Sequence, residues 1–185
     1  MPAYVDTFNL LLALGAIVLQ IVIVVFLINL IFLRSRDNII LLFFKKYGFY
    51  FGFIIAFLSM ALSLFYSNVI GFTACELCWA QRLFIYPQVV LYGFALWKDR
   101  RNLARVIGIF AFVGMLISIY HVYIENGGSS ALACATDNVN AVSCTARYVY
   151  EFGYITIPVM ALTSQVLMLL LAINYLYISK AKSHE

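Results

Sequence analysis

The four cysteines of this 185-residue sequence occur as two separated pairs. Cys75 and Cys78 form a Cys-x-x-Cys motif, and Cys134 and Cys144 follow in the longest polar stretch of the chain. A Cys-x-x-Cys at the start of a helix favours thiol–disulfide exchange, because the helix dipole and the free amide groups stabilise the thiolate and lower its pKa. A thiolate of this kind is both a good nucleophile and a good leaving group. The pattern therefore indicates redox-active cysteines.

Two other roles for the cysteines compete with this interpretation. Each pair could be an inert disulfide that clamps a surface loop, although the short ring between Cys75 and Cys78 would contribute little loop-closure entropy. Four thiolates could instead bind zinc, for which paired cysteines are a known ligand pattern. Nine residues separate Cys134 from Cys144, a spacing unlike that of a zinc knuckle. We therefore expect no metal ion.

Arg82 and His121 are the next candidates for chemistry. Arg82 follows Cys78 by four positions, so on a helix its guanidinium lies one turn deeper on the same face as the sulfur. A cation at that depth needs a polar or anionic partner, such as a quinone carbonyl, unless it snorkels to the lipid headgroups. His121 stands near the end of an apolar segment with Glu125 on the same face, and could move protons or be a structural hydrogen-bonding residue.

The elements that position these residues must be membrane helices. The sequence is 65% hydrophobic and 11% charged, whereas a soluble domain has about 25% charged residues. A chain this apolar has too little polar surface to coat a globule. Its net charge of +4 forms no basic stripe, so we expect no nucleic-acid partner. Five apolar spans are predicted at about residues 8–33, 49–70, 77–97, 106–124 and 154–178.

The basic residues predict how these helices are oriented. Ten of the 12 Lys and Arg residues fall in the first connection, the third connection or the C-terminal tail. Because Lys and Arg prefer the cytoplasmic side, the N-terminus and all the cysteines are expected outside and the C-terminus inside. The external side of a bacterial membrane is oxidising, which permits disulfides there. The predicted fold class is therefore an all-α integral membrane protein.

The segment Cys75-Glu-Leu-Cys78-Trp-Ala-Gln-Arg82 stands at the start of a span, and a second external cysteine pair precedes the last span. In these features the sequence resembles the disulfide bond formation protein B (DsbB) family. Relatives of vitamin K epoxide reductase place the loop pair first, so the order of the pairs disfavours them. The resemblance divides the chain into three parts. Residues 1–47 are an extra N-terminal transmembrane helix with a basic cytoplasmic loop. Residues 48–180 are a four-helix membrane domain with an external loop at 125–153, and residues 181–185 are a cytoplasmic tail.

The resemblance implies a four-helix transmembrane bundle, here with one extra helix, that binds ubiquinone or menaquinone near the outer surface. The implied activity is that of a quinone-dependent protein dithiol oxidase in the bacterial cytoplasmic (inner) membrane. Its implied partner is a soluble DsbA-like protein of the thioredoxin fold. The alternative is a structural or receptor membrane protein with two inert external disulfides. The same chemistry could also run in reverse, since direction depends on the redox potentials of partner and quinone.

The resemblance also implies roles for individual residues. The partner's thiolate is expected to attack Cys134, and Cys144 is expected to exchange with Cys75. Cys78 is then the thiolate that contacts the quinone. Two residues are expected beside the quinone with it: Arg82 and His121.

Overall fold

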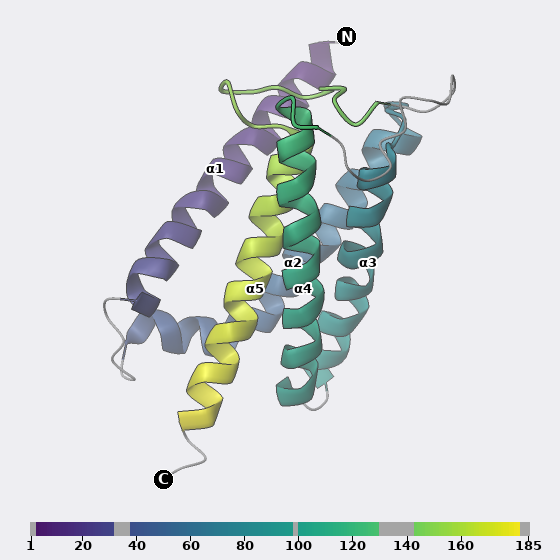
Figure 1. Ribbon diagram of the computed structural model, residues 1–185. Coiled ribbons are helices and arrows are strands. Elements are labelled where there is room, and N and C mark those ends of the chain that lie inside the picture. Colours follow the sequence, from purple (N-terminus) through teal and green to yellow (C-terminus); the bar gives the residue numbers. More distant parts are fainter. Residues whose placement is uncertain (1–2, 32–37, 98–99, 130–142, 182–185) are drawn as a thin grey trace.

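The described part of the chain folds into five helices. The computed structural model describes residues 3–31, 38–97, 100–129 and 143–181, and within these ranges it contains no strand beyond an isolated bridge between Glu151 and Ile155. Helices α2 to α5 form a bundle, and α1 lies along one side of it, against α5 and α2 (Figure 1). The prediction of an all-α protein is confirmed. The helices are α1 (Ala3–Ile31), α2 (Ile39–Asn68), α3 (Glu76–Trp97), α4 (Arg100–Glu125) and α5 (Ile157–Ala181).

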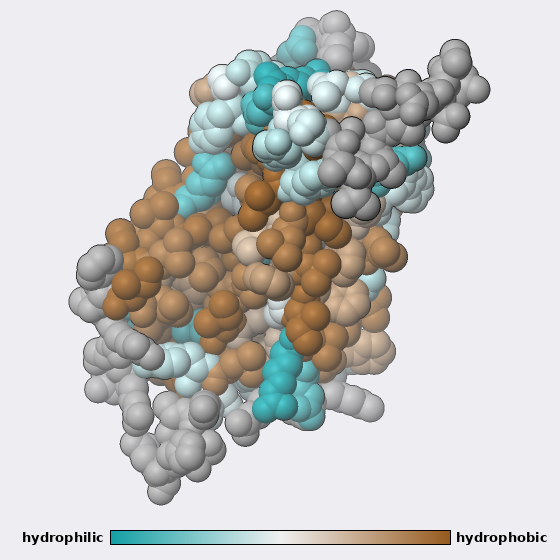
Figure 2. Space-filling view, viewed as in Figure 1, coloured by the Kyte–Doolittle hydropathy of each residue, from teal (hydrophilic) through white to brown (hydrophobic). Residues whose placement is uncertain are grey.

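Four of these helices are long and apolar enough to cross a membrane, namely α1, α2, α4 and α5. Helix α3 forms where a span was predicted, but its polar and aromatic residues keep it outside this group. Large apolar side chains are exposed on all five helices and form a broad apolar band between two more polar ends (Figure 2). Such a surface is far larger than the apolar patches of soluble monomers. The chain is therefore a multi-pass membrane protein.

Helix α2 begins earlier than the apolar pattern predicts. It starts at Ile39, so Lys45 and Lys46 lie inside the helix and not in the connection before it. The side-chain oxygen of Asn38 caps this helix by accepting a hydrogen bond from the amide of Ile40 at 3.0 Å. The hydropathy pattern stops at charged residues, whereas backbone hydrogen bonding continues to the cap.

Small residues allow the bundle helices to approach closely. Five alanines occur in the central core, where they pack around Tyr92 and Phe49. A Cβ atom added at Gly52 of α2 would overlap the ring of Tyr92 on α3. Small residues at helix contacts are typical of membrane bundles, in which close van der Waals packing drives association.

Buried amides also join the helices inside this core. The side-chain nitrogen of Gln88 on α3 donates to the side-chain oxygen of Gln165 on α5 at 2.9 Å. The hydroxyl of Tyr92 donates to the carbonyl of Met168 at 3.3 Å. Polar contacts of this kind fix the relative position of apolar helices. They hold α3, which carries the Cys-x-x-Cys motif, against α5.

Candidate active site

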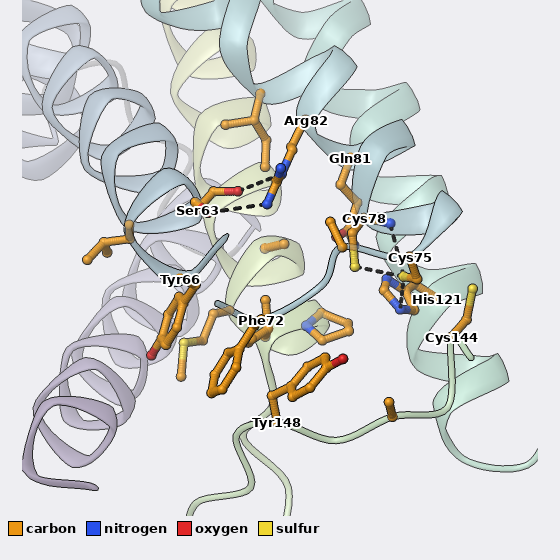
Figure 3. A pocket seen from close by; sticks show the side chains of 18 of the residues that line it. Ser63, Tyr66, Phe72, Cys75, Cys78, Gln81, Arg82, His121, Cys144 and Tyr148 are labelled. Atoms are coloured by element: carbon orange, nitrogen blue, oxygen red, sulfur yellow. Dashed lines mark hydrogen bonds between the residues drawn. The ribbon is translucent and has the colours of Figure 1, made fainter. Parts of the chain in front are cut away.

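A cavity of about 150 Å³ lies at the end of the bundle where α3 begins. All five helices and the segment 143–148 contribute to its lining. Figure 3 shows that the cysteines and His121 gather on one side of this cavity, Arg82 and Ser63 meet at another, and aromatic rings line a third.

Cys75 and Cys78 lie at the first turn of α3. The carbonyl of Cys75 accepts the first helical hydrogen bond, from the amide of Trp79 at 3.1 Å. The Sγ atom of Cys75 accepts a hydrogen bond from the amide of Cys78 at 3.3 Å, so Cys75 acts as the N-cap of the helix. Both cysteines are free thiols, and their sulfur atoms are 2.7 Å apart. The geometry favours negative charge on Cys75, because the helix dipole and the amide both point at its sulfur.

His121 of α4 completes the surroundings of Cys75. Its Nε2 atom lies 3.7 Å from the Sγ atom of Cys75, and its side chain is only 3% exposed. The hydrogen bond from the Cys78 thiol lowers the pKa of Cys75 most strongly; burial opposes this, and His121 lowers the pKa further. The net result is a Cys75 pKa well below that of an ordinary thiol. The Nδ1 atom of His121 has no hydrogen-bond partner among the residues that the structure describes.

Arg82 is held at another part of the cavity wall by serines of α2. Its Nε atom donates to the hydroxyl of Ser63 at 2.9 Å, and one Nη atom donates to the hydroxyl of Ser67 at 2.6 Å. The same Nη atom donates to the Ser63 carbonyl at 3.2 Å, and the guanidinium lies 4.9 Å from the centre of the Trp79 ring. These contacts lower the cost of placing a cation at this depth. They also fix the guanidinium at the cavity wall.

Aromatic rings form another wall. The rings of Tyr66 and Phe72 are stacked with centroids 5.5 Å apart, and those of Phe72 and Tyr148 are stacked at 4.5 Å. The hydroxyl groups of Thr73 and Tyr148 are hydrogen-bonded at 2.9 Å. The stack therefore ties α2, the segment before α3 and the segment after residue 143 into one apolar surface.

Cys144 reaches the same cavity from the segment before α5. It is disulfide-bonded, 3% exposed, and packs in one apolar cluster with Cys75. The segment that carries it is anchored by Arg147, whose Nη atom donates to the carbonyl of Glu125 at 3.0 Å. The Nε atom of Arg147 lies 4.0 Å from the Glu125 carboxylate, which also accepts a hydrogen bond from Thr156 at 2.7 Å. Glu125 thus joins the Cys144 segment to the helix that carries His121.

Helix α1 also contributes to the site. Leu12 lines the cavity, and the side-chain oxygen of Asn9 accepts a hydrogen bond from the hydroxyl of Tyr66 at 2.7 Å. Asn9 and Tyr66 are both buried. The extra N-terminal helix is therefore part of the cavity wall and not merely an anchor beside the bundle.

The structure brings five of the six predicted site residues to one cavity. Cys134 lies outside the described residues. The partners of Arg82 and the contacts of Glu125 with Arg147 and Thr156 were not predicted from the sequence. One signal for the partners of Arg82 was available, because three serines recur at intervals of four residues in an otherwise apolar helix: Ser59, Ser63 and Ser67.

The lining suits a small molecule with an apolar body and polar edges. Aromatic and aliphatic side chains form most of the wall, and Arg82, Gln81 and His121 supply polar groups. Binding sites for small molecules commonly combine an apolar lining with a few placed polar groups. A quinone ring fits this donor set, because the guanidinium of Arg82 can donate to a carbonyl oxygen.

Fold and site together define a multi-pass membrane protein with a Cys-x-x-Cys dithiol capping a helix beside a buried histidine. The chain matches the family described as Disulfide bond formation protein DsbB over residues 45–175. It therefore belongs to the DsbB family, and the predicted resemblance is confirmed. The family makes it a disulfide-generating oxidoreductase of the membrane. Helix α1 precedes the matched residues.

Similar curated proteins carry related names. A probable disulfide formation protein of Oceanobacillus iheyensis is 41% identical over 113 residues, which are 57% of this chain and 72% of that protein. Disulfide bond formation protein C of Bacillus subtilis is 35% identical over 124 residues, covering 65% of this chain and 86% of the relative. Probable disulfide formation protein C 2 of Bacillus anthracis is 30% identical over 141 residues, which are 76% of this chain and 96% of that protein. No solved structure matches the chain significantly.

Proposed function

We propose that this protein is a quinone-dependent dithiol oxidase of the bacterial cytoplasmic membrane, which reoxidises a soluble thioredoxin-fold disulfide donor. Electrons pass from the donor to the loop pair, then to the Cys75–Cys78 pair, and finally to ubiquinone or menaquinone. The observation that carries the proposal is the shared cavity, which Cys75, Cys78, Cys144 and Arg82 all line.

The loop pair exchanges with the soluble donor. A thiolate of the reduced donor attacks the Cys134 sulfur of a Cys134–Cys144 disulfide, which breaks that bond and releases the Cys144 thiolate. The donor's second thiolate then attacks the mixed disulfide. The donor leaves with a disulfide, and Cys134 and Cys144 keep its two electrons as a dithiol.

The inner pair receives these electrons from Cys144. The Cys144 thiolate attacks Cys75 of a Cys75–Cys78 disulfide and releases the Cys78 thiolate; Cys134 then resolves the new bond and restores the loop disulfide. The position of Cys144 in one buried cluster with Cys75 supports this order. The helix terminus and His121 stabilise the Cys75 thiolate that departs when Cys134 resolves the bond.

Three side chains would hold the quinone: Arg82, Gln81 and His121. When bound, a quinone supplies the acceptor for two electrons and two protons, and Cys75 and Cys78 become a disulfide. Arg82 is oriented before binding by Ser63 and Ser67, so little side-chain freedom is lost when it donates to the ligand. Burial of His121 beside the thiols suits it for proton transfer at this point.

The proposed orientation places the cysteines outside. The starts of α1 and α3 lie at one end of the bundle and the end of α5 lies at the other (Figure 1). Lys45 and Lys46 of α2 and Arg105 of α4 belong to the helix ends that lie away from the cysteines. Arg82 and Arg147 are the described basic side chains near the cysteines. This distribution supports a cytoplasmic location for the end away from the cysteines.

Steady-state turnover tests the proposal. The purified protein in lipid nanodiscs is supplied with dithiothreitol as donor and a short-chain ubiquinone or menaquinone as acceptor under argon. We expect quinone-dependent dithiol oxidation that is lost in Cys78→Ser and retained in Leu83→Ala, a control on the exposed face of α3. Dithiol oxidation that is independent of quinone, or unchanged in Cys78→Ser, would contradict the proposal.

A further inference from the structure

We infer that the reduced site binds one Zn²⁺ ion, or a similar divalent transition-metal ion, through the Sγ atoms of Cys75 and Cys78 and the Nε2 atom of His121. The three ligand atoms come from the start of α3 and from α4, and all lie within 4.8 Å of one another. This inference does not depend on the identity of the electron acceptor. It concerns a ligand of the dithiol state and not a resident cofactor of the oxidase.

The distances suit tetrahedral coordination after a small change. With Zn–S bonds of about 2.3 Å and a Zn–N bond of about 2.0–2.1 Å, a tetrahedral site separates sulfur from nitrogen by about 3.6 Å and sulfur from sulfur by about 3.8 Å. The Sγ atom of Cys75 lies 3.7 Å from the Nε2 atom of His121, which already fits. The two sulfur atoms are 2.7 Å apart and must separate. Cys78 is only partly buried, so rotation of its side chain can provide that movement.

The ligand types select the ion. Two thiolates and one imidazole suit Zn²⁺ and its spectroscopic substitutes Co²⁺ and Cd²⁺, whereas Mg²⁺ and Ca²⁺ require oxygen ligands. Three protein ligands leave a fourth position for water, as in zinc sites with two cysteines and one histidine. All three residues line the cavity, which provides access for the ion and room for that water.

The surroundings of His121 predict reversible binding. A histidine that binds a metal ordinarily donates its other ring N–H to a carboxylate or carbonyl, which orients the ring and strengthens the site. The Nδ1 atom of His121 has no such partner among the described residues. The ion should therefore bind more weakly than at a structural zinc site and should be removable by a chelator.

Binding couples to the redox state of the pair. The ion displaces the protons of the two thiols and transfers no electrons, so the cysteines remain reduced. A Cys75–Cys78 disulfide has no thiolate to offer, so the oxidised site should not bind the ion. An ion of this class would therefore hold the inner pair in its reduced form and block disulfide formation.

Cobalt titration tests the inference. The full-length protein in detergent is reduced with a phosphine, desalted under argon and titrated with Co²⁺. We expect sulfur-to-cobalt charge transfer and the visible bands of tetrahedral Co²⁺, saturating at one equivalent and reversed by Zn²⁺ or a chelator. Protein oxidised with diamide should show neither signal.

Variants locate the ion. Cys75→Ser and Cys78→Ser should abolish the tetrahedral signal, and His121→Ala should weaken Co²⁺ binding more than about 10-fold, since even outer partners of metal ligands contribute that much. The sulfur of Cys144 is not one of the proposed ligands, so Cys144→Ser should retain the tetrahedral signal. Circular dichroism checks that each variant keeps its helices. If Cys144→Ser removes the signal and His121→Ala does not, the ion binds the loop thiols and the inference is wrong.

X-ray absorption of the zinc-loaded, reduced protein provides a test without variants. Two sulfur ligands and an imidazole nitrogen in the first coordination shell support the inference. Coordination by four sulfurs, or by oxygen and nitrogen alone, overturns it. A reduced, helical protein that binds no Co²⁺ overturns it as well.

Discussion

The Nε2 atom of His121 lies 3.7 Å from the Sγ atom of Cys75, although the two residues are 46 positions apart in the sequence. Packing of α4 against α3 creates this contact and buries it beside the cavity. The contact adds an imidazole to a cysteine whose sulfur already caps a helix. Its chemical consequence is a stabilised thiolate at Cys75.

Cys75 should therefore stay reactive at acidic pH. Its pKa is lowered first by the Cys78 thiol and then by His121, so the thiolate should persist between about pH 5 and 8, where an ordinary thiol of pKa about 8.5 is largely protonated. The rate of alkylation by iodoacetamide, followed by mass spectrometry of the reduced protein, measures this. Cys78→Ala should move the midpoint upward most, and His121→Ala less. A midpoint near 8.5 in the unchanged protein would rule out the stabilised thiolate.

Arg82→Lys should weaken quinone binding although it keeps the positive charge. Lysine cannot reproduce the fork that contacts Ser63 and Ser67 at once. Hydrogen bonds to charged groups contribute about 1.5–3 kcal/mol, so we expect the KM for quinone to rise about tenfold or more. Ser63→Ala should raise it less, and Leu83→Ala not at all. A KM unchanged in Arg82→Lys would remove Arg82 from the proposed quinone site.

Glu125→Gln should slow electron transfer from the loop pair without slowing the inner pair. The change keeps an acceptor for Thr156 but removes the charge that faces Arg147, which anchors the segment carrying Cys144. Dithiol-driven turnover should fall, while quinone reduction by protein whose thiols are already reduced should stay near its normal rate. An equal loss in both assays would indicate that Glu125 acts at the quinone step or supports the fold.

Asn9→Leu should destabilise the protein by about 1–3 kcal/mol, because it leaves the buried hydroxyl of Tyr66 without its acceptor. Tyr66→Phe in the same chain should recover most of that loss, since both polar groups are then gone. Thermal unfolding in detergent measures both effects. If the two changes are simply additive, the contact between α1 and α2 does not depend on this hydrogen bond.

The helices were predictable because runs of apolar residues long enough to span a membrane have few other structures. The ends of the helices were less predictable. Helix α2 begins at Ile39, since a capping asparagine and not the last charged residue determines where the helix starts. The Cys-x-x-Cys at the start of α3 was evident from the sequence. The position of this motif relative to Arg82 was also evident from the sequence, because the motif and Arg82 lie on one helix.

Contacts between helices could not be predicted in the same way. The partners of Arg82 depend on how far α2 is rotated and shifted against α3. A single sequence does not specify the relative position of two helices. The contact of His121 with Cys75 depends likewise on α3 and α4. The role of α1 in the cavity wall follows from Asn9 and Leu12 facing Tyr66 and the cavity, which an apolar helix pattern alone does not reveal.

A single anaerobic turnover tests the central claim most directly. Protein in nanodiscs with all cysteines reduced is mixed with one equivalent of a short-chain quinone, and quinol absorbance and free thiols are followed in the same sample. We predict that two thiols are lost for each quinol formed, that Cys75 and Cys78 are recovered as a disulfide by mass spectrometry, and that Cys78→Ser forms no quinol. Thiols that stay reduced in the folded protein while quinone remains unchanged would contradict the account.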